Sequence, residues 1–189
     1  MAKLFTKIYS IYCDGAISNN GRKYADREIV GGTGWVILQN DEVIAEGYTS
    51  YPNITDQEEP TNNRMELLSF IEAYTYLRDN QIIFPQEKSS DEIEVFSDSA
   101  YFINSVNDYL PRWEKNGWKN NIGKQIANFD LWQRINKIKD DMKKCFRRKH
   151  ANFFHVKGHA DNTIQNHADE LAVKAKTSKE SHIENFLAQ

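Results

Sequence analysis

With 189 residues, 40% of them hydrophobic, the chain is long enough for one ordinary globular domain with short tails. The absence of any run of about 18 apolar residues argues against a membrane-spanning protein. The first seven residues also lack the apolar stretch of a signal peptide. Cys13 and Cys145 do not have zinc-site spacing and form no disulfide framework. We therefore expect a soluble, cytoplasmic, monomeric protein that makes no membrane contact.

The net charge of −3 argues against a nucleic-acid partner, but the charge is distributed unevenly. Residues 112–150 hold 12 Lys and Arg against 4 acidic residues, a net +8, whereas residues 1–111 carry −10 and residues 151–189 carry −1. Four aromatic residues are interleaved with the basic ones: Trp113, Trp118, Phe129 and Trp132. This basic segment favours attraction to phosphates, although a solvated amphipathic helix would look the same.

The N-terminal third of the chain predicts three strands. An apolar run at 8–13 is followed by a Gly-rich, polar segment at 15–33, which we predict to be a loop. The runs 34–39 and 43–48 are typical of strands, and residues 40–41 of the turn between them. Strands joined in this way form an antiparallel meander.

The rest of the chain predicts alternating helices and strands. An acidic, Pro-bounded loop at 51–60 comes first. The expected elements then follow as a helix at 64–78, a strand at 93–96, a helix from about 99, a helix at 130–144, a strand at 152–156 and a helix at 164–176. The order βββαβααβα predicts an α/β fold. Its five-stranded mixed sheet has three antiparallel strands plus two parallel ones, with helices on both faces. We expect a single domain over 1–177 and a polar tail over 178–189.

In such sheets ligands bind beyond the carboxyl ends of the parallel strands, and four acidic residues map to that end. Asp14 directly follows the first predicted strand and Asp98 the fourth, while Glu66 and Asp169 lie in the first and last of the predicted helices. Each has a structural alternative: a turn, a helix cap, a capping box with Asn63, or a surface charge. Together they would repel one another unless cations neutralised them, and carboxylate ligands favour Mg²⁺ or Mn²⁺.

The strings around these acids resemble the type 1 ribonuclease H signature across about residues 8–177. The strongest string is Thr61-Asn62-Asn63-Arg64-Met65-Glu66-Leu67. Four others keep the family's order: Tyr12-Cys13-Asp14-Gly15, Ser97-Asp98-Ser99, Val156-Lys157-Gly158-His159-Ala160 and Ala168-Asp169-Glu170-Leu171-Ala172. The resemblance extends to the aromatic and basic stretches 113–119 and 130–134.

The resemblance implies an endoribonuclease that hydrolyses the RNA strand of RNA/DNA hybrids and leaves 5′-phosphate and 3′-hydroxyl ends. Asp14, Glu66, Asp98 and Asp169 match the family's metal-binding carboxylates. Two Mg²⁺ ions, with Mn²⁺ as a possible substitute, would activate a water and stabilise the departing 3′ oxygen. His159 matches the loop histidine that assists catalysis, and it titrates near neutrality. As a lone loop residue it has an incidental alternative.

Choosing the RNA strand requires contact with ribose 2′-hydroxyl groups. Asn62 and Asn63 are candidates for it, together with Glu66. Asn20 matches a substrate-contacting asparagine of the family, although Asn20-Gly21 could simply form a turn. Five residues of the basic segment resemble the family's basic protrusion, which handles the DNA strand: Trp113, Lys115, Trp118, Lys119 and Lys124. Core packing is the alternative for the two tryptophans.

Two other functions compete with this interpretation. One is a nuclease or strand transferase of the wider ribonuclease H-like superfamily that acts on DNA, which the 61–67 and 157–160 strings argue against. The other is a non-catalytic module that binds hybrids. Four retained carboxylates argue against such a module, because only metal chemistry requires them to converge.

Overall fold

The structure, a computed structural model, describes residues 6–18, 29–52, 59–83, 90–146, 151–158 and 162–187. Its strands are β1 (Ile8–Ile17), β2 (Val30–Gln39), β3 (Glu42–Pro52), β4 (Glu92–Ser97), β5 (Ala151–His155) and β6 (His182–Asn185). Its helices are α1 (Asn62–Asp79), α2 (Ala100–Asn104), the π-helical turn η2 (Ser105–Tyr109), α3 (Leu110–Lys115), α4 (Phe129–Cys145) and α5 (Thr163–Ser178).

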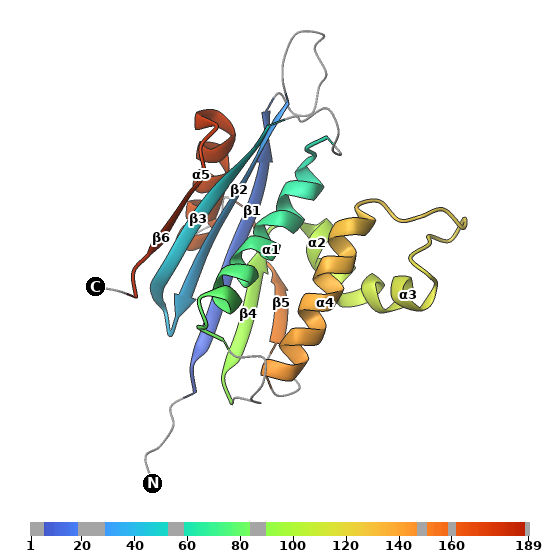
Figure 1. Ribbon diagram of the computed structural model, residues 1–189, viewed down its shortest axis with the longest axis horizontal. Helices are drawn as coiled ribbons and strands as arrows, with labels where there is room; N and C mark the ends of the chain where they lie inside the picture. The colour runs from blue at the N-terminus through green and yellow to red at the C-terminus, as the bar shows by residue number, and fades with distance from the viewer. Residues whose placement is uncertain are drawn as a thin grey trace.

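The six strands form one mixed sheet in the order β5-β4-β1-β2-β3-β6 (Figure 1). β1, β2 and β3 form the predicted antiparallel meander, and β4 and β5 run parallel to β1. Asn40 and Asp41 make the predicted turn between β2 and β3, with φ angles of 51° and 69°. Two positive φ angles are typical of a tight hairpin turn whose twist matches its strands. The predicted α/β fold is therefore confirmed.

The segment 15–33, predicted to be a loop, is strand at both of its ends. β1 continues to Ile17 and β2 already begins at Val30. The glycines were misleading because here they serve close packing instead of turns. A Cβ atom on Gly32 would stand only 2.2 Å from the carbonyl oxygen of Ala172 in α5. Glycine in β2 therefore marks the place where α5 lies directly on the sheet.

The C-terminal segment, predicted to be a polar tail, contains a sixth strand. β6 pairs antiparallel with β3 between Ala45 and Tyr48, and the Phe186 N–H donates to the Ile44 carbonyl at 2.9 Å. All four residues of β6 are exposed. A strand this short, without alternation of apolar and polar residues, gives no signal in the sequence. The prediction of five strands was wrong for this reason.

The predicted helices are confirmed to within a few residues at α1, α4 and α5. The helix expected from about Ser99 is a succession of α2, η2 and α3, which ends at Lys115. None of the helices in the described ranges is both long and apolar enough to cross a membrane.

Helices cover both faces of the sheet, as predicted (Figure 1). The larger hydrophobic cluster lies between the sheet and helices α1 to α4, and the smaller one lies under α5. Buried aromatic side chains dominate the larger cluster, among them Trp35, Phe70, Tyr74, Phe102 and Trp132. These two layers fix α1 and α5 on opposite sides of β1 and β2.

A buried carboxylate anchors α1 to the sheet. Glu72 accepts a hydrogen bond from the Thr33 hydroxyl at 2.6 Å and another from the Tyr51 hydroxyl. Burial raises the pKa of Glu72, and these hydrogen bonds oppose the rise. One turn earlier, the buried Ser69 hydroxyl donates to the Gly34 carbonyl at 2.6 Å. Because buried polar groups are costly without partners, these bonds fix the position of α1 along β2.

Candidate active site

The register of the sheet places Asp14 and Asp98 at the same level of neighbouring strands. The parallel pairing of β1 with β4 ends at Tyr12 and Phe96, and each acid lies two residues further along its strand. Asp14 therefore lies inside β1, which is longer than predicted, and its side chain is only 7% exposed. Asp98 follows β4 directly, as predicted, and is half-buried.

Two of the structural alternatives for these acids are wrong. Asp14 and Gly15 lie in extended strand, so they do not form a turn. Asp98 does not cap α2, because Ser99 is the N-cap and its hydroxyl accepts a hydrogen bond from the Phe102 N–H at 3.1 Å.

Glu66 reaches this site because α1 lies unusually close to β1. A Cβ atom on Gly15 would stand 2.3 Å from the Glu66 backbone nitrogen, so only glycine permits this approach. The Glu66 carboxylate also accepts a hydrogen bond from the Ser99 hydroxyl. The N-cap of α1 is Thr61, which accepts from the Arg64 N–H at 3.2 Å, and no capping box needs Glu66.

Asp169 arrives from the other face of the sheet on α5. One turn before it, the amide nitrogen of Gln165 donates to the Cys13 carbonyl at 3.4 Å, and Gln165 is only 1% exposed. Residues four apart lie on the same side of a helix, so this bond aligns the half-buried Asp169 with the end of β1.

The four carboxylates perturb one another electrostatically. Burial, followed by the charge of Asp98, raises the pKa of Asp14 to about 8. The charges of Asp169 and Glu66 raise this pKa further, whereas the Gly15 N–H, which donates to the Asp14 carboxylate at 2.6 Å, lowers it. Burial also raises the pKa of Glu66, against the Ser99 hydrogen bond. Burial and the neighbouring charges thus favour the protonated form of Asp14 when no cation is bound.

This donor set fits a divalent cation. Carboxylate oxygens are the ligands that Mg²⁺ and Mn²⁺ prefer, and the mutual repulsion is the kind that a cation relieves. Within the described ranges, no three acidic, histidine or cysteine side chains form a group that could hold a metal ion as they stand. The four carboxylates therefore lie near enough to raise the pKa of Asp14 without forming a complete metal site.

Two predicted site residues, Asn20 and His159, lie outside the described residues. The residue before the histidine is described: a Cβ atom on Gly158 would stand 2.4 Å from a carboxylate oxygen of Asp98. The chain that leaves β5 therefore lies against Asp98 at Gly158, the last residue described before His159. Asn62 and Asn63 are exposed at the start of α1.

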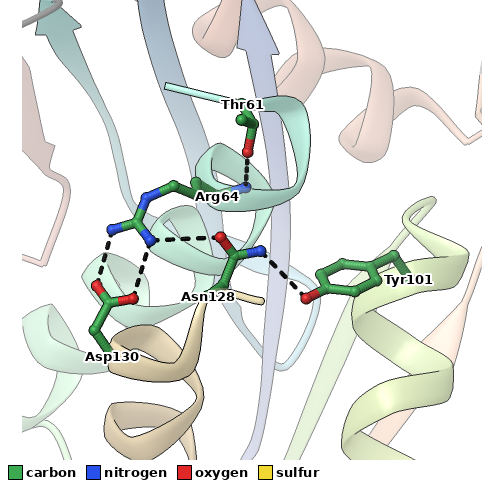
Figure 2. Close-up of polar contacts among 5 residues, drawn as sticks. All are labelled: Thr61, Arg64, Tyr101, Asn128 and Asp130. Carbon is green, nitrogen blue, oxygen red and sulfur yellow. Dashed lines mark hydrogen bonds and ion pairs between the residues drawn. The ribbon is translucent and has the colours of Figure 1, made fainter. Parts of the chain in front are cut away.

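An arginine that we did not single out from the sequence holds the start of α1 in place (Figure 2). Arg64 donates to both carboxylate oxygens of Asp130, at 3.0 and 2.8 Å, and to the Asn128 side-chain oxygen at 3.4 Å. The Asn128 amide in turn donates to the Tyr101 hydroxyl at 3.2 Å. The network joins α1, two residues before Glu66, to α2 and α4. The sequence holds no signal for it, because the partners are about 65 residues apart.

In the basic segment the predicted lysines are exposed, whereas the predicted tryptophans are partly packed. Lys115, Lys119 and Lys124 are exposed, as contact with phosphates would require. Trp113 and Trp118 are half-buried and pack against the core, as the packing alternative expects, and their contact with substrate stays a prediction.

Beside these lysines lies a groove of about 610 Å³ with an aromatic and cationic lining. The rings of Tyr109 and Trp113 stack along it with centroids 5.9 Å apart, and Arg112 and Lys119 line it as well. Tyr109 was not predicted, although its spacing of four residues from Trp113 places both rings on one helix face.

Comparisons with known proteins agree with this geometry. The RNase H family profile matches residues 6–177. The chain is 36% identical over 167 residues to the ribonuclease H of Chlorobaculum parvum, covering 88% of this chain and 93% of that protein. It is 32% identical over 170 residues to the ribonuclease H of Acetivibrio thermocellus, covering 88% and 92%.

Solved structures share the fold at lower identity. LC9-RNase H1, described as a type 1 RNase H with the type 2 active-site motif, superposes with a TM-score of 0.69 at 23% identity, covering 97% of this chain and 80% of that one. LC11-RNase H1 in complex with an RNA/DNA hybrid gives a TM-score of 0.57 at 19% identity, covering 90% and 98%. From the profile match and the identities to its relatives, we conclude that this chain belongs to the RNase H family.

Proposed function

We propose that this chain is a type 1 ribonuclease H, an endoribonuclease that hydrolyses the RNA strand of RNA/DNA hybrids and leaves 5′-phosphate and 3′-hydroxyl ends. The observation that carries the proposal is the convergence of four carboxylates from β1, α1, α5 and the end of β4. A cluster that raises the pKa of its most buried member to about 8 is costly to fold, and metal-dependent chemistry gives it a purpose.

Enzymes of this family generally depend on divalent metal ions. We assign the ligand role to Asp14, Glu66, Asp98 and Asp169, which would hold two Mg²⁺ ions, for which Mn²⁺ could substitute. When bound, the ions supply Lewis acidity for the attacking water and for the departing oxygen. The protein's own residues orient these ligands: Ser99 holds Glu66, and Gln165 aligns α5 with β1.

We assign strand choice to the exposed start of α1. Asn62 and Asn63 are exposed there, near the partly buried Glu66, and they would contact the 2′-hydroxyl groups that the minor groove of the hybrid displays. The bonds of Arg64 to Asp130 and Asn128 hold this turn rigidly, as the reading of a single hydroxyl group requires. A cytoplasmic location and a monomeric state remain part of the proposal.

The proposed activity predicts strict substrate choice. Cleavage is expected for an RNA/DNA hybrid in the presence of Mg²⁺, and for a DNA strand carrying a short ribonucleotide tract only within that tract. The measurement is a gel assay of labelled hybrid, duplex RNA and duplex DNA, each with Mg²⁺ or with EDTA. Efficient cleavage of all-DNA duplex would instead indicate a DNA nuclease of the wider superfamily. Tight hybrid binding without any cleavage would indicate a binding module.

A second prediction concerns the basic segment, to which we assign the uncut DNA strand. Lys115, Lys119 and Lys124 are exposed beside the aromatic groove, so changing all three to alanine is expected to weaken hybrid binding. Each lost phosphate contact lowers the salt slope by about 0.9, so the triple variant should lose up to about 3 units. The Michaelis constant should rise, whereas turnover at saturation should change far less.

The matched control removes the same charge from the end of α5, by changing Lys174, Lys176 and Lys179 to alanine. That variant is expected to keep nearly the wild-type salt slope. Equal effects of the two triple variants would show that only net charge matters. An unchanged slope in the Lys115, Lys119 and Lys124 variant would make the segment a solvated helical face.

A further inference from the structure

Three aromatic rings cross three neighbouring strands in register. Tyr12 of β1 pairs with Phe96 of β4, which pairs with Phe154 of β5. The rings of Tyr12 and Phe96 stack with centroids 4.6 Å apart and an interplanar angle of 12°. The rings of Phe96 and Phe154 stack with centroids 5.3 Å apart and an interplanar angle of 22°. We call this row the aromatic ladder.

The ladder lies on the half of the sheet that α5 leaves uncovered. Helices α1 to α4 bury their side chains in the cluster on the opposite face, with Ile11 and Val95, which alternate with the ladder residues. Among the described helices only α5 lies on the ladder's face, and it packs over β1, β2 and β3 (Figure 1). Tyr12 touches its edge, whereas Phe154, at the far end of the row, is 41% exposed.

Acidic groups accompany the ladder. Glu94 lies two residues before Phe96 on the same face of β4, and Asp41 lies in the neighbouring hairpin turn. The charges of Glu94 and Asp41 add to burial in raising the pKa of Tyr12. Partial burial raises the pKa of Glu94, followed by the charges of Glu92 and Asp41. A surface with this charge repels phosphates and attracts cations.

On the half of the same face that α5 covers, basic side chains of α5 contact an aromatic ring and a carboxylate. There the ammonium group of Lys174 on α5 lies 4.7 Å from the centroid of the Tyr48 ring. His167, also on α5, contacts the Glu46 carboxylate at 2.9 Å. Over the uncovered half, no lysine or arginine in the described ranges lies above a ring of the ladder. Within the described ranges, basic groups of α5 thus contact the rings and acids of one half of the face, while the rings of the other half have no such group above them.

We propose that the aromatic ladder, with Glu94, binds an extended arginine- or lysine-bearing segment of a partner protein. Cations above aromatic faces are attracted by the ring quadrupole, and arginine can stack on such a ring and pair with a carboxylate. Phe154 is exposed, and Tyr12 and Phe96 are partly buried. The row is therefore more apolar than an ordinary solvated strand face, which favours an interaction surface. The ladder borders the acidic cluster, because Tyr12 and Phe96 lie two residues before Asp14 and Asp98. It uses none of the four carboxylates and lies apart from the basic segment, so the inference does not depend on the proposed function.

The test measures the affinity of a fluorescein-labelled (Arg-Gly)4 peptide by fluorescence anisotropy. Wild-type protein is expected to bind it, and to bind a (Glu-Gly)4 peptide far more weakly. Phe154→Leu keeps an apolar side chain but removes the ring, and Glu94→Gln removes the charge. Together they are expected to weaken binding of the arginine peptide about tenfold or more, since each contact is worth a few-fold at an exposed site. Hybrid cleavage by the double variant should be unchanged.

Matched controls are Glu184→Gln, an exposed acid on β6, and Tyr109→Leu, an exposed ring on the basic groove. Both should bind the peptide like wild type. The proposal is overturned if the controls lose as much affinity as the ladder variants, because the attraction is then general. It is also overturned if the ladder variants change the melting temperature but not the affinity for the peptide. A third contrary result would be that a labelled dT12 strand binds the protein and that this binding, unlike that of the peptide, is lost in the Phe154 and Glu94 variants.

Discussion

Asp98→Asn is expected to lower the turnover of hybrid cleavage by on the order of a thousandfold. The same change is expected to raise the melting temperature of the metal-free protein. The charge of Asp98 is the strongest of the three that raise the pKa of Asp14, so its removal relieves a repulsion that folding creates. A gain of about 1 kcal/mol would raise the melting temperature by about 2–4 °C in a protein of this size.

The same variant is expected to change the pH dependence of stability. The pKa of Asp14 is about 8 in the folded protein and about 3.9 in an unfolded chain. Between these values the folded state binds more protons, so stability falls as the pH rises from about 4 and stops falling above about 8. Without the Asp98 charge the pKa of Asp14 drops and this fall becomes shallower.

Melting curves between pH 4 and 9 in EDTA, with turnover measured in Mg²⁺, check both expectations. Asp108→Asn, an exposed acid on η2, is the matched control and should leave turnover and the pH profile unchanged. Wild-type turnover in Asp98→Asn would remove this residue from the active site. Loss of folding together with activity would give it a structural role instead.

Gly15→Ala is expected to destabilise the protein by about 1–3 kcal/mol and to lower turnover more than tenfold. The new methyl group would stand 2.3 Å from the backbone nitrogen of Glu66 and 2.5 Å from the backbone carbon of Met65, so α1 must move away from β1. That movement withdraws the Glu66 carboxylate from Asp14. Urea unfolding measures the first effect, and turnover as a function of Mg²⁺ concentration measures the second, with more Mg²⁺ needed for half-maximal activity.

Gly123→Ala is the control for this substitution. Gly123 has a φ of 77° with no atom within 4 Å of its Cβ position, so alanine there adds backbone strain of about 1 kcal/mol without a clash. Its turnover should match wild type. If Gly15→Ala lost stability but kept wild-type turnover and Mg²⁺ dependence, the close approach of α1 to β1 would serve packing alone.

The sequence predicted most of this fold because its signals are local. Alternating or continuous apolar runs gave the strands, helical spacing gave α1, α4 and α5, and Asn40-Asp41 gave the turn. It failed at the start of β2, where Gly32 serves the contact with Ala172 in α5. A glycine has the same appearance in a turn and under a close-packed helix, and only the tertiary structure distinguishes them.

The candidate site, like the fold, was predictable only where its signals are local. Strand register alone brings Asp14 and Asp98 together, so two acids after two apolar runs were sufficient. The approach of Glu66 depends instead on Gly15, which the sequence placed at the start of a loop. The clamp of Arg64 on Asp130 joins residues far apart in the chain, and no periodicity or spacing predicts such a pair.

β6 covers an edge of the sheet through which copies of this protein could otherwise associate. Without that strand, the backbone N–H and C=O groups of Ala45–Tyr48 would form an open sheet edge, the usual template on which one chain adds to another. Because β6 buries none of its own side chains, it contributes little to the hydrophobic core. β6 thus covers an edge that the core does not need covered, and it counters aggregation more than it stabilises the catalytic centre.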